Sequence, residues 1–248
     1  MFNLRLDNPS ILKQTAAVLS DFITEATFTF SKNGIKLIAM DPANICMVNL
    51  DILPSLFSEY AVEQAKEVTL NLSYLQQALN RARSSDAVTL SVEKNKLKLT
   101  ILGKSTKRFF IPLLEKEGKE RSAPDLDFSA KVEMDADEFK DYIDDASIAG
   151  DAITFDVDED KLNIHSGETG SKVHIEIKKG SDAVVSFELK EKARSIFSIE
   201  YLKKIASSAK LTDTVVMNLS NDYPTRLDFK ALNKLRMQFI LAPRIENQ

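Results

Sequence analysis

The side chains whose density first suggests chemistry are carboxylates. Paired carboxylates can bind a metal ion or transfer protons. At helical spacing they are also typical of a solvated helix face, whose first turn is stabilised by negative charge. We favour this second interpretation for the acidic segment, which contains Asp135, Asp137, Glu138, Asp141, Asp144 and Asp145.

A second acidic group and the two histidines lie in segments with strand-like alternation. Asp156, Asp158 and Asp160 resemble the start of a calcium-binding loop, but the glycine and the later bidentate glutamate of such a loop are missing. His165 and His174 have no cysteine or third histidine nearby. We therefore expect no metal site.

The usual catalytic motifs are also missing from the sequence. The 7 glycines include no phosphate-binding loop, and no Gly-x-Ser-x-Gly elbow supports a nucleophilic serine. The single cysteine, Cys46, is flanked by Ile45 and Met47 and is predicted to be a buried thiol. These observations predict a binding or scaffolding protein without a cofactor, and not an enzyme.

Composition and charge narrow the class of partner. The chain has 248 residues, 44% hydrophobic residues and a formal net charge of −4. No bulk attraction to nucleic acid or anionic membranes is expected, although a local basic patch remains compatible with this charge. The N-terminus lacks the apolar run of a signal peptide and no stretch is long enough to span a membrane. We expect an intracellular protein with no membrane partner.

One stretch of the sequence occurs twice with a constant shift of 127 positions. The motif is Tyr74-Leu75, Ala82, Asp86 and Val88, and it recurs as Tyr201-Leu202, Ala209, Asp213 and Val215. Each copy is predicted to run from a helix through a turn into a strand. A helix-and-strand unit repeated after half the chain predicts two similar domains joined end to end.

Apolar residues alternate with polar ones along most of the chain, which predicts antiparallel sheets with one buried face. The hairpin turns are expected at 32–34, 93–95 and 159–160. Four segments have helical spacing instead. They are expected to begin near Asn8 and Pro9, at Ser73, at about Asp135 and at Ser198. The fold class is therefore α+β, with two helices in each half.

The inward stripes of these helices can be read from the spacing of their apolar residues. The first helix is expected to bury Leu12, Ala16, Leu19 and Ile23, and the second Leu75, Leu79 and Ala82. The third, reaching Ala149, is expected to bury Phe139, Ala146 and either Tyr142 or Ile143. The fourth is expected to bury Leu202, Ile205, Ala206 and Ala209.

A charged, aperiodic segment with Gly118 and Pro124 separates the halves and has the composition of a linker. We predict an N-terminal domain at 1–114, a linker at 115–127 and a C-terminal domain at 128–248.

Three segments resemble the sliding DNA clamps of the proliferating cell nuclear antigen (PCNA) family. They are Gly34 to Ile45 (GIKLIAMDPANI), Leu241 to Glu246 (LAPRIE), and Ser10 to Lys13 with Asp21 to Ala26. The Asp-Pro after Met40 and the short tail are more similar to archaeal than to eukaryotic members. The resemblance covers essentially the whole chain.

This resemblance implies a DNA-clamp fold that closes into a trimeric ring around duplex DNA without reading its sequence. The ring would tether a DNA polymerase, a flap endonuclease and a DNA ligase, and a clamp loader of the replication factor C type would open it. The implied location is the cytoplasm or nucleoid of an archaeon, or the nucleus of a eukaryote.

Phosphate contact requires basic side chains on the helices that line the pore. The candidates lie on polar helix faces, where an ordinary exposed charge is the alternative interpretation. They are Lys13, Arg81, Arg83, Lys140, Lys203, Lys204 and Lys210.

The resemblance also implies an apolar docking site for short client peptides near the linker. For the methionines, ordinary core packing is the alternative. The matching positions are Met40, Asn44, Ile45, Met47, Ala123, Pro124, Pro224, Ile240, Leu241, Ala242, Pro243 and Arg244. The polar residue Arg121 and the small Ala123 depart from the aliphatic pattern of many clamps.

The resemblance also implies subunit contacts between the strand at 104–113 and a neighbour's strand at 172–179, which would pair two otherwise exposed strand edges. The apolar contributors would be Phe109, Ile111, Val173, Ile175 and Ile177.

Two other functions remain open at this stage. One is a subunit of a heterotrimeric or checkpoint-type clamp that recruits repair proteins. The other is a β-rich hydrolase with an unrecognised site.

Overall fold

The computed structural model describes residues 2–116, 121–167 and 170–244. Part of the predicted linker, including Gly118, and the end of the C-terminal motif, Ile245 and Glu246, lie outside the described residues. The chain divides into two compact units. The first takes the described residues of Met1–Pro42, Val48–Ala123 and Ala231–Met237, and the second takes those of Ala43–Met47, Pro124–Lys230 and Gln238–Gln248.

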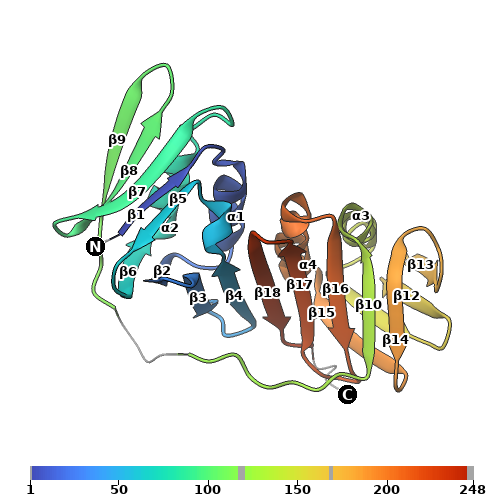
Figure 1. The fold of residues 1–248 in the computed structure, drawn as a ribbon. Helices are drawn as coiled ribbons and strands as arrows, with labels where there is room; N and C mark the ends of the chain where they lie inside the picture. Colours follow the sequence, from blue (N-terminus) through green and yellow to red (C-terminus); the bar gives the residue numbers. More distant parts are fainter. Residues whose placement is uncertain (1, 117–120, 168–169, 245–248) are drawn as a thin grey trace. The chain divides into compact units, whose positions relative to one another are not determined.

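The first half of the chain forms two runs of antiparallel strands (Figure 1). One has the order β5-β1-β7-β8-β9, and the other has the order β4-β3-β2-β6. The strands are β1 (Phe2–Leu6), β2 (Glu25–Ser31), β3 (Gly34–Met40), β4 (Cys46–Ile52), β5 (Glu59–Val62), β6 (Lys66–Asn71), β7 (Ala87–Glu93), β8 (Lys96–Leu102) and β9 (Thr106–Pro112), and a short 3₁₀ turn, η1 (Pro54–Leu56), precedes β5.

The second half repeats this topology strand for strand. Its two runs have the orders β14-β10-β16-β17-β18 and β13-β12-β11-β15, so each strand has a counterpart nine labels earlier. The strands are β10 (Ala130–Asp135), β11 (Ala152–Val157), β12 (Lys161–Ser166), β13 (Val173–Lys178), β14 (Val184–Leu189), β15 (Ala193–Ser198), β16 (Thr214–Leu219), β17 (Thr225–Ala231) and β18 (Leu235–Leu241). The duplication predicted from the repeated motif is confirmed.

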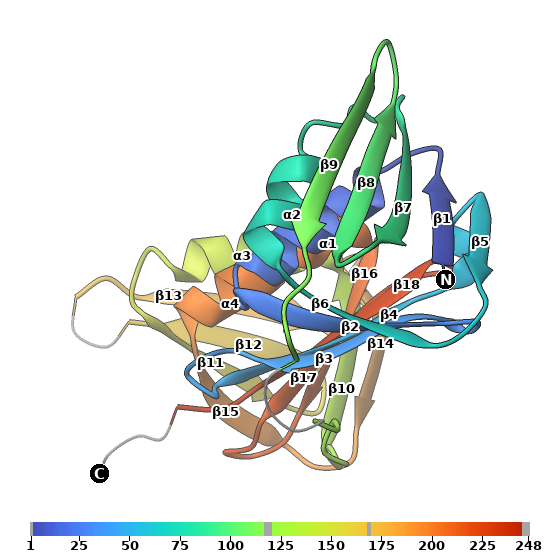
Figure 2. The same ribbon diagram turned by 90° about the vertical axis from the view of Figure 1, so that its left-hand side faces the viewer.

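Each half carries a pair of short α-helices that pack against each other, as Figure 2 shows for α1 and α2. The first pair is α1 (Ser10–Ser20) and α2 (Leu72–Leu79), and the second is α3 (Ala136–Ala146) and α4 (Ile199–Ala206). A 3₁₀ turn, η2 (Ser207–Leu211), continues from α4. Two helices per half were predicted, and among the described residues this prediction is confirmed.

The helices bury the apolar stripes that their spacing predicted, with differences at the ends. Ile23 and Ala82 are buried but lie beyond the last residues of α1 and α2. In α3, Ile143 is fully buried and Tyr142 is not, which decides between the two candidates. Helix ends shift because turn residues can fill the same core position without helical hydrogen bonds.

The β2–β3 turn shows why glycine is needed at position 34. Its φ angle is +126°, a conformation that residues with a Cβ atom rarely adopt, and a Cβ atom there would overlap the carbonyl oxygen of Ile52.

Among the described residues, no helix has both the length and the apolar character needed to cross a bilayer.

Asn71 and Ser198 occupy the same N-cap position in the two repeats but cap their helices differently. The Asn71 side chain accepts hydrogen bonds from the backbone N–H groups of Ser73 at 3.0 Å and Tyr74 at 3.4 Å. Ser198 makes no side-chain capping hydrogen bond to α4. The sequence predicted that the fourth helix begins at Ser198 because serine is a common N-cap residue. In the structure Ser198 is the N-cap residue of α4, but its side chain makes no capping hydrogen bond.

This difference predicts that Asn71→Ala destabilises the protein by about 1 kcal/mol, because two N–H groups lose their acceptor. Ser198→Ala is the matched control and should have a clearly smaller effect. Urea unfolding midpoints at one fixed protein concentration would measure both. Equal losses would contradict the assignment of the capping bond.

Candidate nucleic-acid interface and partner surfaces

The predicted basic residues all lie on or beside the four helices. Lys13 is on α1 and Lys140 on α3, at equivalent positions of the repeat. Arg81 and Arg83 follow α2, whereas Lys203 and Lys204 are on α4 and Lys210 is on η2. The structure therefore gathers these residues on the helices of their own unit.

In the second unit, α3 neutralises part of this charge with its own carboxylates. Lys140 Nζ lies 2.8 Å from Asp144 Oδ2, one helical turn away, and Lys203 Nζ of α4 lies 3.5 Å from Asp144 Oδ1. The hydrogen bond to Asp144 raises the pKa of Lys140, and the same bond lowers the pKa of Asp144. Lys204 pairs in turn with Glu200 at 2.7 Å. Exposed pairs of this kind add little stability, so their main effect is on surface charge.

In the first unit, the cations have different partners. Lys13 Nζ donates to the Ala82 carbonyl at 2.8 Å, which ties α1 to the turn after α2. Arg81 and Arg83 are exposed, as is Lys210, the second-half counterpart of Arg83. Within the described part of the chain, no carboxylate forms an ion pair with the side chains of these three residues.

A second candidate surface consists of two unpaired sheet edges. β9 ends the five-stranded run of the first unit, and β13 ends the four-stranded run of the second. These strands lie within the two ranges predicted for subunit contacts.

The apolar residues predicted at both edges differ in how far their own unit covers them. Phe109, Val173 and Ile175 are half-buried, whereas Ile111 and Ile177 are both 4% exposed and already belong to the core of their own unit. Phe110, on the opposite face of β9, is 47% exposed. The sequence did not predict a role for Phe110. Alternation shows that Phe109 and Phe110 lie on opposite faces of β9, but it does not show which face is exposed.

The two edges also differ in charge. At β9, Lys107 Nζ donates to the Arg81 carbonyl at 3.3 Å, so that Lys107, Arg81 and the exposed Arg108 lie near one edge. At the other edge, α3 packs over β12 and β13, whereas α4 packs on β15. The first-unit edge is therefore basic, and an acidic helix covers the second-unit edge.

The carboxylates of α3 divide between two sides of the helix. Lys140 and Asp144 face α4, so helical spacing places Glu138, Tyr142 and Asp145 on the side away from α4, toward the β13 edge. Burial, followed by a hydrogen bond to Glu138, raises the pKa of Tyr142 to about 12. The acidic third helix thus presents charge to the edge as well as to solvent.

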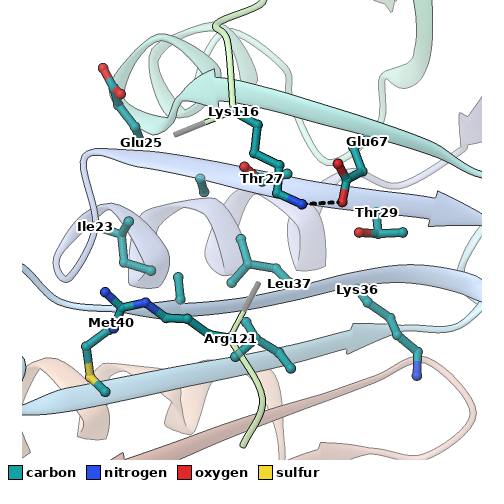
Figure 3. Close-up of a pocket in the computed structure, with 13 residues that line it drawn as sticks. Ile23, Glu25, Thr27, Thr29, Lys36, Leu37, Met40, Glu67, Lys116 and Arg121 are labelled. Atoms are coloured by element: carbon teal, nitrogen blue, oxygen red, sulfur yellow. Dashed lines mark hydrogen bonds and ion pairs between the residues drawn. The ribbon is translucent and has the colours of Figure 1, made fainter. Parts of the chain in front are cut away.

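The third candidate surface is a cavity of about 390 Å³ in the first unit. Figure 3 shows it between β2, β3 and β6 and the beginning of the linker. Its lining includes the apolar residues Ile23 and Leu37, which are buried, and Ile38, which is 36% exposed, and Met40 lies at one end. Its rim is polar and carries Glu25, Thr27, Thr29, Lys36, Glu67, Lys116 and Arg121.

The linker is attached where it passes this cavity. Leu114 N–H donates to the Thr69 carbonyl at 2.8 Å, and Lys116 Nζ lies 2.8 Å from Glu67 Oε1. Arg121 reaches from the other end of the linker toward Met40 (Figure 3). Arg121, one of the two linker residues that depart from the family pattern, therefore borders the cavity.

The remaining residues predicted for client binding differ in accessibility. Asn44, Ile45, Pro124 and Arg244 are exposed, and Ala123, Pro224, Ala242 and Pro243 are intermediate. Met47, Ile240 and Leu241 are buried, at 8%, 9% and 0% exposure. Ile240 and Leu241 are neighbours on β18 and point to opposite faces, so both faces of the strand are covered at this end.

Backbone donors near the C-terminus are already engaged within the second unit. Ala242 N–H donates to the Ile45 carbonyl at 3.0 Å, and Arg244 N–H donates to the Ile196 carbonyl at 2.7 Å. The Arg244 side chain also pairs with Asp151 at 3.0 Å. The backbone N–H groups of two residues predicted for client binding are therefore already engaged within the chain.

Two halves of one topology, each with antiparallel strands and a helix pair, define a two-domain clamp-type fold. A crystal structure of PCNA from Thermococcus kodakaraensis has this fold, with a TM-score of 0.92 and 27% sequence identity. The match covers 98% of this chain and 100% of that chain.

Sequence comparisons agree with the structural match. The family model for the PCNA N-terminal domain matches residues 1–113, and the model for the C-terminal domain matches 122–244. A DNA polymerase sliding clamp from Nanoarchaeum equitans is 38% identical over 94% of this chain and 95% of its own length. DNA polymerase sliding clamp 1 from Thermococcus kodakarensis is 29% identical over 99% of both chains. The chain belongs to the proliferating cell nuclear antigen family.

Proposed function

We propose that this chain is a DNA sliding clamp, a processivity factor that encircles duplex DNA and tethers replication and repair proteins. The observation that carries the proposal is the duplicated topology with unlike open edges at β9 and β13, in a chain of the PCNA family. The proposed role is that of a scaffold, with no catalytic step of its own.

The open edges support self-assembly into a ring. Joining two different edges head to tail is a heterologous contact, which makes a closed ring when the rotation between neighbours closes. A neighbour's strand would cover Phe109 on one side and Val173 and Ile175 on the other, so sheet and core would continue between subunits. We propose three copies per ring. The similarity to proteins named DNA polymerase sliding clamps does not favour the mixed or checkpoint-type clamp.

We propose that the helices of the ring face DNA through their basic residues. The free cations Arg81, Arg83 and Lys210 are the most available for phosphate contact, and Lys13, Lys140, Lys203 and Lys204 share their charge with protein groups. Weak contact suits a clamp, because encirclement rather than affinity holds it on DNA. The net charge of −4 is compatible with such a role.

We propose that clients dock partly in the cavity beside the linker. Its volume of about 390 Å³ and its apolar lining residues suit side chains of a short peptide. Of the accessible residues in the predicted set, Met40 lines this cavity, and Ala123 and Pro124 lie in the linker. Arg121 would favour clients with a nearby carboxylate. The proposed partners are a DNA polymerase, a flap endonuclease, a DNA ligase and a clamp loader.

We also propose the domain boundaries that the sequence predicted, with an N-terminal domain at 1–114, a linker at 115–127 and a C-terminal domain at 128–248.

The function predicts longer DNA products from a polymerase when the chain and a clamp loader are added to primed circular DNA. On linear DNA with open ends the gain should largely disappear, because a ring slides off, and blocking both ends should restore it. Primer extension resolved on a gel measures all three. Equal stimulation on circular and open linear DNA would contradict encirclement.

The same assay can test the cavity with one variant inside it and one control variant outside it. Met40→Ala should reduce polymerase stimulation while leaving the size of the assembly unchanged. Leu232→Ala removes an apolar side chain that is 74% exposed in the β17–β18 turn, outside the cavity, and should have no effect. Loss of stimulation in both variants would argue against the docking role.

The charge difference between the two edges predicts how the ring can be opened. The unmodified chain should scatter light as about three times 27.8 kDa. Glu138→Lys combined with Asp145→Lys should give single chains, because both edges then carry positive charge. Adding Arg81→Glu and Lys107→Glu to the same chain should restore the ring.

A control for this experiment changes the same amount of charge elsewhere. Glu59→Lys with Glu63→Lys alters two exposed residues in and just after β5, at the opposite end of the first-unit sheet from β9, and should leave the ring intact. Single chains from this control, or an intact ring from the edge variant, would refute the assignment of the edges.

The shared carboxylate Asp144 predicts a gain in DNA binding when its charge is removed. Asp144→Asn removes the carboxylate that Lys140 and Lys203 share, while Lys140 keeps its longer contact with Asp141 at 3.8 Å. The logarithm of affinity should therefore depend on salt more steeply by about 0.9 for each phosphate newly contacted. Fluorescence anisotropy with a short duplex at several salt concentrations measures this slope. Asp137→Asn removes an exposed charge from the same helix without freeing these lysines, and a steepening of equal size there would contradict the prediction.

A further inference from the structure

The two histidines of the chain are direct neighbours in space. His165 on β12 and His174 on β13 are partners in the antiparallel register. Their Nδ1 atoms are 2.9 Å apart, and their ring centroids are separated by 4.4 Å with an interplanar angle of 37°. The sequence argued against a metal site because no third ligand lay nearby, but it could not show that these two side chains meet.

The geometry of the pair is that of two ligands aimed at one point. In a contact between two Nδ1 atoms one ring donates its proton and the other accepts it. If the donor ring changes tautomer, so that its proton sits on Nε2 after exchange with solvent, both Nδ1 lone pairs are available to one metal ion and both rings stay neutral. With metal–nitrogen distances of about 2.0–2.1 Å, nitrogens 2.9 Å apart subtend an angle of about 90°, whereas a tetrahedral site requires a separation of about 3.4 Å.

Solvent can reach the histidine pair. His174 is exposed and His165 partly so, on the face of the sheet that is not covered by helices. Among neighbouring side chains, Glu176 is paired with Lys161 at 2.7 Å. In the part of the chain that the structure describes, no group of three ligating side chains converges. Water would therefore occupy the other coordination positions.

We propose that His165 and His174 form a two-histidine site for a divalent transition metal. The angle near 90° fits the neighbouring positions of a tetragonal or octahedral ion better than those of tetrahedral zinc. Imidazole ligands and the general order of affinities for divalent metals make Cu²⁺ the tightest candidate, followed by Ni²⁺. The site does not depend on the proposed clamp function.

Metal binding would have a structural consequence at the sheet edge. β13 is held by β12 alone, and an ion bound to both histidines would join the two strands through their side chains as well. Because the pair is preformed only in the folded protein, the ion would stabilise that state by mass action. If β13 forms the ring contact proposed above, the same ion would stiffen one side of each subunit boundary.

The site can be tested by titrating the untagged full-length chain with Ni²⁺ or Cu²⁺ and measuring heat. One ion per chain is expected, and His165→Ala and His174→Ala should each weaken binding at least tenfold. Electron paramagnetic resonance of the Cu²⁺-loaded chain should show two equivalent nitrogen ligands. Glu176→Gln is the matched control on β13 and should keep the affinity.

Two results would overturn the proposal. One is the absence of a stoichiometric ion on the unmodified chain. The other is binding that persists in the variant lacking both histidines, which would place the ion elsewhere. Circular dichroism and light scattering of the variants would show whether their fold and assembly are retained, so that lost binding can be attributed to the missing imidazoles.

Discussion

Each unit depends on burying one face of its antiparallel strands beneath a pair of short helices. Helices of eight to eleven residues, such as α2 and α1, are marginal alone and owe their stability to this contact. The burial requires apolar residues at alternate positions, and in β2 and β7 every buried residue is apolar and every second residue is buried. Strand order decides which strands lie at the edges of each sheet. The helix pair leaves these edges open, because it covers a face of the sheet and cannot pair with strand backbones.

The two repeats use this common framework for different charge arrangements. Lys13 and Lys140 occupy equivalent positions, but Lys13 donates to a backbone carbonyl and Lys140 donates to the carboxylate of Asp144. The turn after the second helix carries Arg81 and Arg83 in one half, where the other has Ser208 and Lys210. A duplicated fold therefore need not contribute equally from each half to DNA contact or to subunit contact.

Much of the fold could be predicted from the sequence, because alternation and capping are local properties. The strand segments, the four helices and the duplication follow from residue spacing within a few turns of chain. The ends of elements were less certain: Ile23 and Ala82 are buried in turns, and the last predicted turn of the fourth helix is the 3₁₀ segment η2. For the site, residue type located the helix cations, but it could not show that Asp144 binds two of them.

The sequence by itself determined the α+β class, the repeated unit and the family resemblance, since each is written in residue types and their spacing. Only the tertiary structure decided which apolar residues stay open to partners, because burial depends on neighbours distant in the chain: Met47 and Leu241 are core, and Phe110 is exposed. It also decided that His165 faces His174, because strand register is set by pairing across the sheet and not by either strand alone.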